Sequence, residues 1–299
     1  MQSEASAYQV LLFYKYVEIE DPEYFARKHL KFCESIDLKG RVLIGKEGIN
    51  GTVSGPKECT EQYMKELTND PRFADIEFKI DDAESHTFKK MHVRARNEIV
   101  SLRLDDDIDP NETTGNYLEP KEFMNALESG DVIVIDARND YEYDIGHFRN
   151  AIRPNIKAFR ELPEWIEENL SDQKDKKVLT YCTGGIRCEK FSGYLKKKGF
   201  NDVSQLHGGI VTYGKDPDVQ GKYFDGKCFV FDDRLAVDVN QTDEATVVGK
   251  CYHCGTEADM YINCTNVQCD KLHIVCDDCL DSHQRYCSSS CKEISMSHQ

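Results

Sequence analysis

The stretch KVLTYCTGGIRCEKFSG, residues 177–193, decides how the central part of the chain folds. Residues 178–181 form a short apolar run that is typical of a β-strand, and this run stops at Cys182. A loop with two glycines follows, and after Arg187 the apolar residues are spaced for the buried face of a helix. A strand that leads through a glycine loop into a helix directs several backbone N–H groups to one point, beside the positive end of the helix dipole.

Cys182 stands at the start of this loop, where the amides, the helix N-terminus and the Arg187 guanidinium favour negative charge on sulfur. We therefore predict that Cys182 is a catalytic nucleophile assisted by Arg187, in a loop that can also hold a persulfide or an oxyanion. The active-site loop between them consists of Thr183, Gly184, Gly185 and Ile186. The alternative for Cys182 is a small apolar cysteine packed at a strand end. Cys188 falls in the first helical turn, where we expect burial, with a role as resolving thiol as the alternative.

The composition indicates a protein of two or three domains, because 299 residues are enough for each to have its own core. The chain begins without the pattern of a secretory signal, and no apolar run approaches the length of a membrane span, in line with a mean hydropathy of -0.60. We expect a cytoplasmic protein with no membrane partner. In that compartment its 13 cysteines should be reduced thiols or metal ligands rather than disulfides.

Charge is unevenly distributed along the chain. The formal net charge of -16 disfavours nucleic-acid binding, because phosphate contacts require Lys and Arg. Residues 86–103 are nevertheless the most basic segment, and its cations are Lys89, Lys90, Arg94, Arg96 and Arg103. The acidic residues 105–116 that follow are expected to form a linker. A local basic face can therefore exist on this acidic protein.

The first 104 residues show the order strand, helix, strand, strand, helix, strand. Runs of β-branched and aromatic residues predict strands at 8–17, 41–45, 49–55 and 73–80. Asp21-Pro22 and Pro56 are start signals for the two helices. This order is that of a ferredoxin-like α+β domain with a split βαβ unit, and strand-like residues at 92–104 are expected to extend its sheet.

Residues 117–240 change to an alternation of strand and helix. The predicted elements are a helix after Glu119-Pro120, a buried strand at 131–138, a helix at 163–169, a strand at 178–181 and a helix that ends at Gly199. Residues 204–209 close the unit, and FDGKCFVFDD, residues 224–233, is expected to form a hairpin extension. The pattern predicts an α/β domain with a mostly parallel sheet.

Behind a polar stretch at 240–250, the tail of residues 251–299 contains four close pairs of cysteines. They are Cys251 and Cys254, Cys264 and Cys269, Cys276 and Cys279, and Cys287 and Cys291. Eight thiolates in such pairs fit two structural zinc sites, and we favour a cross-brace in which the first pair joins the third and the second joins the fourth. His253, His273 or His283 can replace a cysteine, and a coincidental cluster or a disulfide knot is the alternative.

The central domain resembles the rhodanese family. The stretch IDARNDYEYDIGHFRNAI, residues 135–152, carries the family pattern D-x-R…E…G-H…A, with Asp136 and Arg138 as supporting residues. The loop from Cys182 to Arg187 resembles the rhodanese active-site loop, and LHGGI, residues 206–210, resembles its closing strand and glycine pair. The resemblance implies a cysteine that carries a persulfide. Four residues separate Cys182 from Arg187, whereas phosphatase-type relatives have five, so sulfur chemistry is favoured over phosphate hydrolysis.

Over essentially its whole length the chain resembles the bacterial tRNA uridine(34) hydroxylase family. The resemblance rests on the ferredoxin-like domain, the phrase GRVLIGKEGINGTVSG at residues 40–55, the rhodanese unit and the cysteine-rich tail. It implies a tRNA partner, molecular oxygen as co-substrate and hydroxylation of the wobble uridine at C5 to 5-hydroxyuridine, with Cys182 as the required cysteine. The sequence carries no facial-triad iron pair and no G-x-G-x-x-G fingerprint, so we expect no iron, flavin or nicotinamide cofactor.

If tRNA is the partner, the basic segment is the expected contact face. We predict that tRNA binds Lys89, Lys90, Arg94 and Arg96, with Arg41 and Lys46 beside them. The alternative is a solvated sheet edge whose cations prevent aggregation.

Two other functions remain open for this sequence. One is a thiosulfate-type sulfurtransferase in which Cys182 carries sulfane sulfur. The other is a non-catalytic adaptor that uses the zinc tail as an interaction module. The intact Cys182 and Arg187 count against the adaptor, since the resemblance implies that inert rhodanese domains lack the cysteine.

Overall fold

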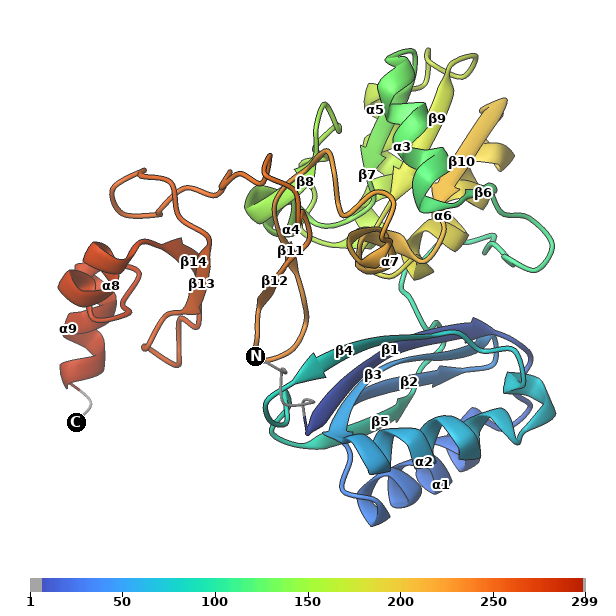
Figure 1. Ribbon diagram of the computed structural model, residues 1–299, viewed down its shortest axis with the longest axis horizontal. Helices are drawn as coiled ribbons and strands as arrows, with labels where there is room; N and C mark the ends of the chain where they lie inside the picture. Colours follow the sequence, from blue (N-terminus) through green and yellow to red (C-terminus); the bar gives the residue numbers. More distant parts are fainter. Residues whose placement is uncertain (1–6, 298–299) are drawn as a thin grey trace.

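The computed structural model describes residues 7–297. Figure 1 shows a sheet with two helices on one face, a second α/β layer next to it, and a smaller C-terminal tail that extends to one side. Within residues 7–297, no helix combines the length and the apolar composition needed to cross a membrane.

The N-terminal part is an α+β unit in which two helices cover one face of a mainly antiparallel sheet (Figure 1). Its elements are β1 (Tyr8–Tyr16), α1 (Pro22–Ser35), β2 (Lys39–Gly45), β3 (Gly48–Pro56), α2 (Lys57–Thr68) and β4 (Phe78–Ala83). Asp21 caps α1 by accepting a hydrogen bond from the backbone N–H of Tyr24, and Pro22 follows as the first helical residue. The strand order β4-β1-β3-β2 confirms the predicted ferredoxin-like topology.

Two strands of this part differ from their predicted limits. The strand predicted at 73–80 is wrong in its first half, because Pro71–Phe73 forms a 3-10 helix and β4 begins only at Phe78. Proline holds φ in the helical range, which ends the apolar run as a turn instead of a strand. The extension predicted at 92–104 is limited to β5 (Met91–Ala95), which pairs in parallel with β2 at the edge of the five-stranded sheet.

The central part is an α/β domain with a parallel four-stranded sheet, as predicted. Its elements are β6 (Asn116–Leu118), α3 (Pro120–Ser129), β7 (Ile133–Asp136), α4 (Asp140–Ile145), α5 (Leu162–Asn169), β9 (Lys177–Tyr181), α6 (Ile186–Lys197), β10 (Asp202–Leu206) and α7 (Gly209–Lys215), with a 3-10 turn at Phe159–Glu161. The strand order β6-β10-β9-β7 places β9 inside the sheet, where its apolar side chains are buried. The active-site loop therefore starts from a rigid internal strand.

A three-stranded antiparallel sheet stands beside this domain and contains β8 (Gly146–Phe148), β11 (Phe224–Phe229) and β12 (Ala236–Asp238). The hairpin predicted at 224–233 is wrong in position, because that stretch holds one strand and part of the turn. Asp225-Gly226 has the composition of a turn, yet it lies within β11. The backbones approach so closely there that a Cβ on Gly226 would lie 2.2 Å from the carbonyl oxygen of Ile145, so only glycine fits.

The tail contains β13 (Met260–Asn263), β14 (Leu272–Val275), α8 (Asp277–His283) and α9 (Ser289–Ser297). Its two strands form an antiparallel hairpin. The tail packs on the central domain through Tyr261, whose hydroxyl donates to the carbonyl oxygen of Tyr141 at 2.7 Å. The buried side chains of Ile145 and Phe229 belong to the same small core. The tail is thus attached to the domain that carries Cys182.

Lys190 of α6 joins the N-terminal part to the central domain. Its ammonium is completely buried and lies 2.8 Å from Glu47, 3.2 Å from Glu98 and 2.8 Å from Asp107. Glu47 lies in the turn between β2 and β3, whereas Asp107 belongs to the acidic segment that follows the N-terminal part. A buried charge needs such partners, so this cluster fixes the N-terminal sheet over the start of α6.

Candidate active site and metal centres

Cys182 directly follows β9 and is completely buried, with 0% of its surface exposed. The backbone N–H of Gly185, a residue with φ of +103°, donates to its sulfur at 3.2 Å. The glycine pair after β10 packs against the same loop. A Cβ on Gly209 would lie 2.6 Å from the carbonyl oxygen of Cys182, and that oxygen accepts from the N–H of Ile210 at 3.0 Å. The close packing explains why glycine stands at both positions.

The surroundings of Cys182 lower the pKa of its thiol to about 6. Burial alone would raise this pKa, but the Cys188 thiol, the Arg187 guanidinium and the backbone N–H groups of both residues stabilise the thiolate more strongly. The pKa of Cys188 moves the other way, because burial and the adjacent Cys182 sulfur both raise it. At neutral pH, Cys182 is therefore the thiolate and Cys188 is the thiol that donates to it.

Arg187 is oriented by a carboxylate. Its two terminal nitrogens donate to the two oxygens of Glu142, each at 2.7 Å, and one of them also lies 3.4 Å from Thr183 Oγ1. Burial alone would lower the pKa of Arg187, and the Glu142 carboxylate raises it instead. The two-point ion pair fixes the guanidinium plane beside the loop. Glu142 belongs to the rhodanese pattern, but its pairing with a residue 45 positions away follows only from the fold.

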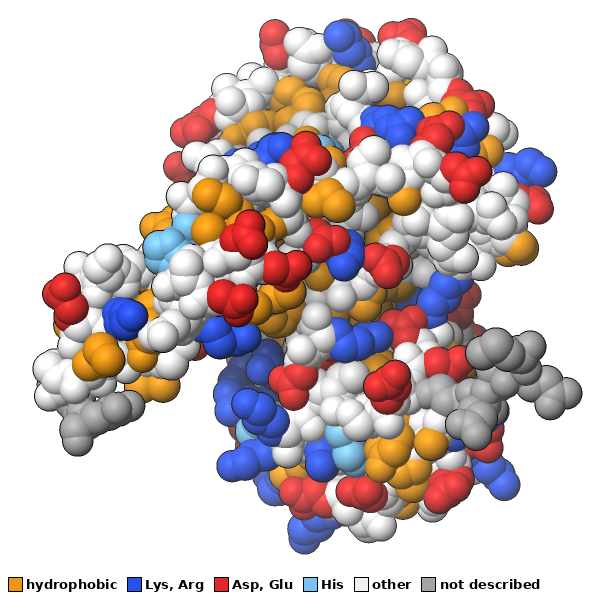
Figure 2. All heavy atoms as spheres, turned by 60° about the vertical axis from the view of Figure 1, so that its left-hand side comes forward, with side chains coloured by type: hydrophobic (Ala, Val, Ile, Leu, Met, Phe, Trp, Pro, Cys, Tyr) orange, Lys and Arg blue, Asp and Glu red, His pale blue; other side chains and the backbone are white. Residues whose placement is uncertain are grey.

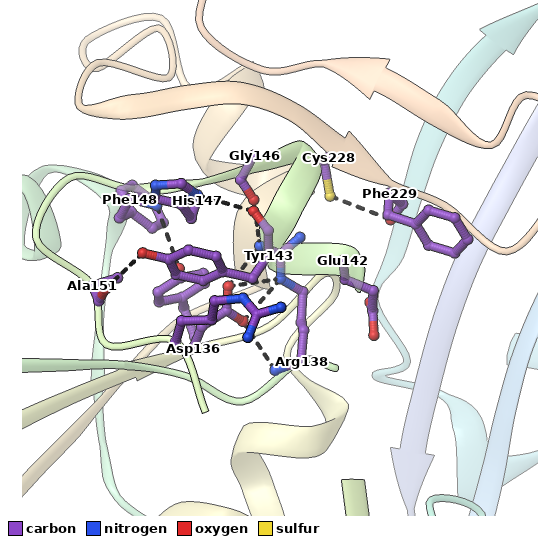
Figure 3. Close-up of polar contacts among 12 residues, drawn as sticks. Asp136, Arg138, Glu142, Tyr143, Gly146, His147, Phe148, Ala151, Cys228 and Phe229 are labelled. Atoms are coloured by element: carbon purple, nitrogen blue, oxygen red, sulfur yellow. Dashed lines mark hydrogen bonds and ion pairs between the residues drawn. The ribbon is translucent and has the colours of Figure 1, made fainter. Parts of the chain in front are cut away.

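Asp136 and Arg138 form a second buried ion pair in the same domain (Figure 3). Arg138 donates to the Asp136 carboxylate through Nε at 2.9 Å and Nη2 at 2.6 Å, and Nη2 also donates to the carbonyl oxygen of Gly146 at 2.7 Å. Both side chains are 0% exposed, and the guanidinium lies near the rings of Tyr181 and Phe224. The pair joins the end of β7 to β8 and so supports the shape of the domain.

Side chains of β1 cover the active-site loop. A Cβ on Gly185 would lie 2.8 Å from the Tyr14 hydroxyl, and a Cβ on Gly184 would lie 2.7 Å from the Leu12 side chain. The Tyr14 hydroxyl also donates to the buried Glu189 of α6 at 2.8 Å. Sequence reasoning missed these residues. The signal that could have found them is the apolar character of both faces of β1, which indicates that the face without helices is covered too.

The four cations predicted to bind tRNA lie on and beside the edge strand β5. They are Lys89, Lys90, Arg94 and Arg96, and all are exposed. Within residues 7–297, none of them takes part in an ion pair. Arg41 lies opposite His92 and lines, together with Lys89 and Lys90, a groove of about 700 Å³. Lys46 is also exposed but stands apart, in the turn between β2 and β3. Figure 2 shows Lys and Arg side chains gathered on the N-terminal part where it faces the tail.

The eight tail cysteines come together in two groups, and in each group the sulfur atoms lie within 4.8 Å of one another. One group is Cys251, Cys254, Cys276 and Cys279, and the other is Cys264, Cys269, Cys287 and Cys291. This is the cross-brace arrangement. The sulfurs of Cys254 and Cys276 are 3.6 Å apart, close to the distance of about 3.8 Å expected between two ligands of a tetrahedral zinc ion with bonds of about 2.3 Å. The residues present therefore fit two tetrahedral metal ions.

The three tail histidines do not belong to either group. His253 and His283 stack with ring centroids 3.8 Å apart, and His273 lies edge-on to His253. Their role is in packing beside the first cysteine group rather than replacement of a cysteine.

Comparison with known proteins places the whole chain. Family models match the UPF0176 acylphosphatase like domain at residues 8–99, the Rhodanese-like domain at 119–216 and the Rhodanase C-terminal region at 225–292. The tRNA uridine(34) hydroxylase of Bacillus licheniformis is 63% identical over 285 residues, which cover 95% of this chain and 88% of that relative. The chain belongs to the tRNA uridine(34) hydroxylase family.

A second member of the tRNA uridine(34) hydroxylase family, from Staphylococcus carnosus, is 60% identical over 286 residues, which cover 96% of this chain and 89% of the relative. Among solved structures, a rhodanese-like domain protein from Staphylococcus aureus is 28% identical, with a TM-score of 0.28 and coverage of 34% of this chain and 94% of that chain. The assignment to the tRNA uridine(34) hydroxylase family confirms the resemblance inferred from the sequence.

Proposed function

We propose that this protein hydroxylates the wobble uridine of tRNA at C5, giving 5-hydroxyuridine, with molecular oxygen as co-substrate and in the cytoplasm. The observation that carries the proposal is the 63% identity to a relative named tRNA uridine(34) hydroxylase over 95% of this chain. The site supports it, because a buried thiolate in an amide-lined loop is a strong nucleophile.

Cys182 is the proposed catalytic residue, and Arg187 holds the charge of its sulfur. Attack of this sulfur on the uracil ring makes C5 electron-rich, and C5 then takes one oxygen atom from O2. The second oxygen atom leaves as water, which requires two electrons and two protons besides the uridine. A persulfide on Cys182 is our candidate for their source. The side chains of Leu12 and Tyr14 exclude water from the loop between turnovers.

Nucleoside mass spectrometry of tRNA from a strain that lacks this gene tests the proposal. We expect 5-hydroxyuridine and its derivatives at position 34 to disappear and to return when the wild-type gene is restored. The loop also suits a persulfide carrier, so a thiosulfate sulfurtransferase is the second candidate. Sulfur transfer without tRNA, together with normal 5-hydroxyuridine in the deletion strain, would establish that candidate instead.

The basic side chains on and beside β5 are the proposed tRNA contacts. A protein with Lys89, Lys90, Arg94 and Arg96 all changed to Ala should bind tRNA more weakly, with a salt dependence reduced by about 0.7–0.9 log units per lost phosphate contact. Binding titrations at several salt concentrations measure both quantities.

The matched control changes four exposed lysines on the helical face, Lys28, Lys31, Lys57 and Lys65, to Ala. This control alters the net charge equally and should keep the wild-type salt slope. An unchanged slope and affinity in the first variant would assign its cations to protection of the sheet edge.

We also propose that each cysteine group holds a structural zinc ion, and that the chain divides into a domain at 1–104, a linker at 105–116, a domain at 117–240 and a zinc tail at 251–299. An all-thiolate shell leaves no open coordination position, so the ions serve folding.

Metal analysis of the purified protein should find two zinc ions per chain. A Cys279→Ser change should release one ion and unfold the tail locally, because the tail has few other buried contacts. Proteolysis after treatment with a strong chelator should then cut within residues 251–297 and spare the core domains. Retention of two ions and of protease resistance in the variant would contradict the assignment.

A further inference from the structure

Phe231 lies in the turn of the hairpin between β11 and β12, and 49% of its surface is exposed. The turn around it is rigid. The N–H of Val230 donates to the carbonyl oxygen of Leu235, and the Asp232 carboxylate accepts from Arg234 through Nε at 2.9 Å and Nη2 at 2.7 Å. The Phe231 ring makes an edge-to-face contact with the Phe229 ring at 5.1 Å, which leaves its own face open. The fold thus fixes an aromatic face towards solvent.

Two hollows meet at this ring. The first is the basic groove of about 700 Å³ that Arg41, Lys89 and Lys90 line. The second is a small cavity of about 50 Å³ lined by Leu12, Lys79 and Thr183, the residue after Cys182. Val230, Phe231 and Asp232 line both hollows. Phe231 therefore stands between the basic groove and the active-site loop.

The register of the N-terminal sheet connects the same two places. Lys79, Leu12, Thr52, Arg41 and His92 are successive cross-strand partners on β4, β1, β3, β2 and β5. Directly paired residues share one face of a sheet, so this row crosses the face without helices, from the loop to the groove. Lys79 lies over the Tyr14 ring at 4.9 Å and, within residues 7–297, forms no ion pair. The row therefore carries positive charge at both ends.

We propose that Phe231 is a stacking platform for a base of single-stranded RNA, whose phosphates lie against Arg41, Lys89 and Lys90. The inference rests on the proposed function and deepens it, because it names the element that presents the anticodon loop to Cys182. A groove with cations for the backbone and an aromatic face for a base is the combination that single-stranded nucleic acids bind. A duplex does not fit this description, since its bases have no free face.

The carboxylates of the groove are compatible with this partner. Asp232, Asp233 and Asp270 line it as well. Asp232 is neutralised by Arg234, with both oxygens occupied. The three Lys and Arg side chains in the groove then outnumber the two remaining carboxylates.

Fluorescence anisotropy with a labelled anticodon stem-loop RNA tests the proposal on the full-length protein. We expect Phe231→Ala to weaken binding of the stem-loop about ten-fold, the effect of one lost base–aromatic stack. The salt slope should stay at the wild-type value, because stacking releases no counterions. Phe231→Trp should retain the affinity. Tyr24→Ala, which removes a ring with 51% exposure from α1 on the helical face, is the matched control and should bind as the wild type does.

A fully paired RNA of the same length separates stacking from a structural effect. Its binding should not respond to Phe231→Ala. Wild-type affinity of the alanine variant for the stem-loop, or an equal loss for stem-loop and duplex, would overturn the proposal. If a deletion strain keeps its 5-hydroxyuridine while Phe231→Ala still weakens stem-loop binding alone, the RNA site stands and the hydroxylase function fails.

Discussion

A Cys182→Ala protein should fail to restore 5-hydroxyuridine to the tRNA of a deletion strain while remaining folded. The substitution removes the thiolate that the loop stabilises, and loss of a catalytic nucleophile costs on the order of 10³-fold or more in rate. It removes only one buried atom, so the free energy of unfolding should change by about 1 kcal/mol. Nucleoside mass spectrometry gives the modification level, and thermal unfolding of the purified protein gives the stability.

Cys33→Ala is the matched control for this experiment. Cys33 is equally buried, but it lies in α1, and burial raises the pKa of its thiol to about 12. The control should therefore modify tRNA normally. Normal 5-hydroxyuridine with Cys182→Ala would show that the reaction does not use this sulfur.

Asp136→Asn should destabilise the protein more than any surface substitution in the same domain. The change leaves the Arg138 guanidinium, 0% exposed, without its counter-charge. Removal of one partner of a buried ion pair costs about 3–5 kcal/mol, which corresponds to a fall in Tm of about 10 °C for a domain of this size. Calorimetry or circular dichroism during heating measures the change.

Asp144→Asn provides the comparison, because Asp144 pairs with Arg153 at the surface and is 45% exposed. An exposed pair of this kind contributes less than about 1 kcal/mol. If the two variants melt at the same temperature, the Asp136–Arg138 pair does not hold β7 and β8 together as described.

The fold could be predicted where local signals agree with tertiary structure. In the N-terminal part, Pro22 and Pro56 mark the starts of the helices, and the apolar runs mark the strands. The errors occur where tertiary contacts decide. Asp225-Gly226 has turn composition but sits within a strand, because β11 passes closely by the backbone of Ile145. The short elements α4 and β8 were missed for the same reason, since Arg138 and Glu142 inside them gain their partners only from the fold.

The active-site loop was accessible to sequence reasoning because its parts are contiguous. The strand, the glycines and Arg187 lie within 17 residues of the quoted stretch, and the hydrogen bond between Gly185 and Cys182 spans three positions. The cover over this loop was not accessible, because Tyr14 and Glu189 are 175 positions apart and no spacing links them. The tail shows both cases: spacing predicts the cysteine pairs, and the grouping around each site depends on how β13 and β14 pair.

The thiolate on Cys182 is the central claim, and its titration tests the claim most directly. The ultraviolet absorbance of thiolate, measured against pH in the wild type and in Cys182→Ser, isolates this one sulfur by difference. The thiolate form should appear as pH rises, with a midpoint near the pKa of about 6, so that the group is almost fully ionised at neutral pH. A midpoint at the ordinary value of about 8.5 or above would contradict the account, because the loop would then provide no activation.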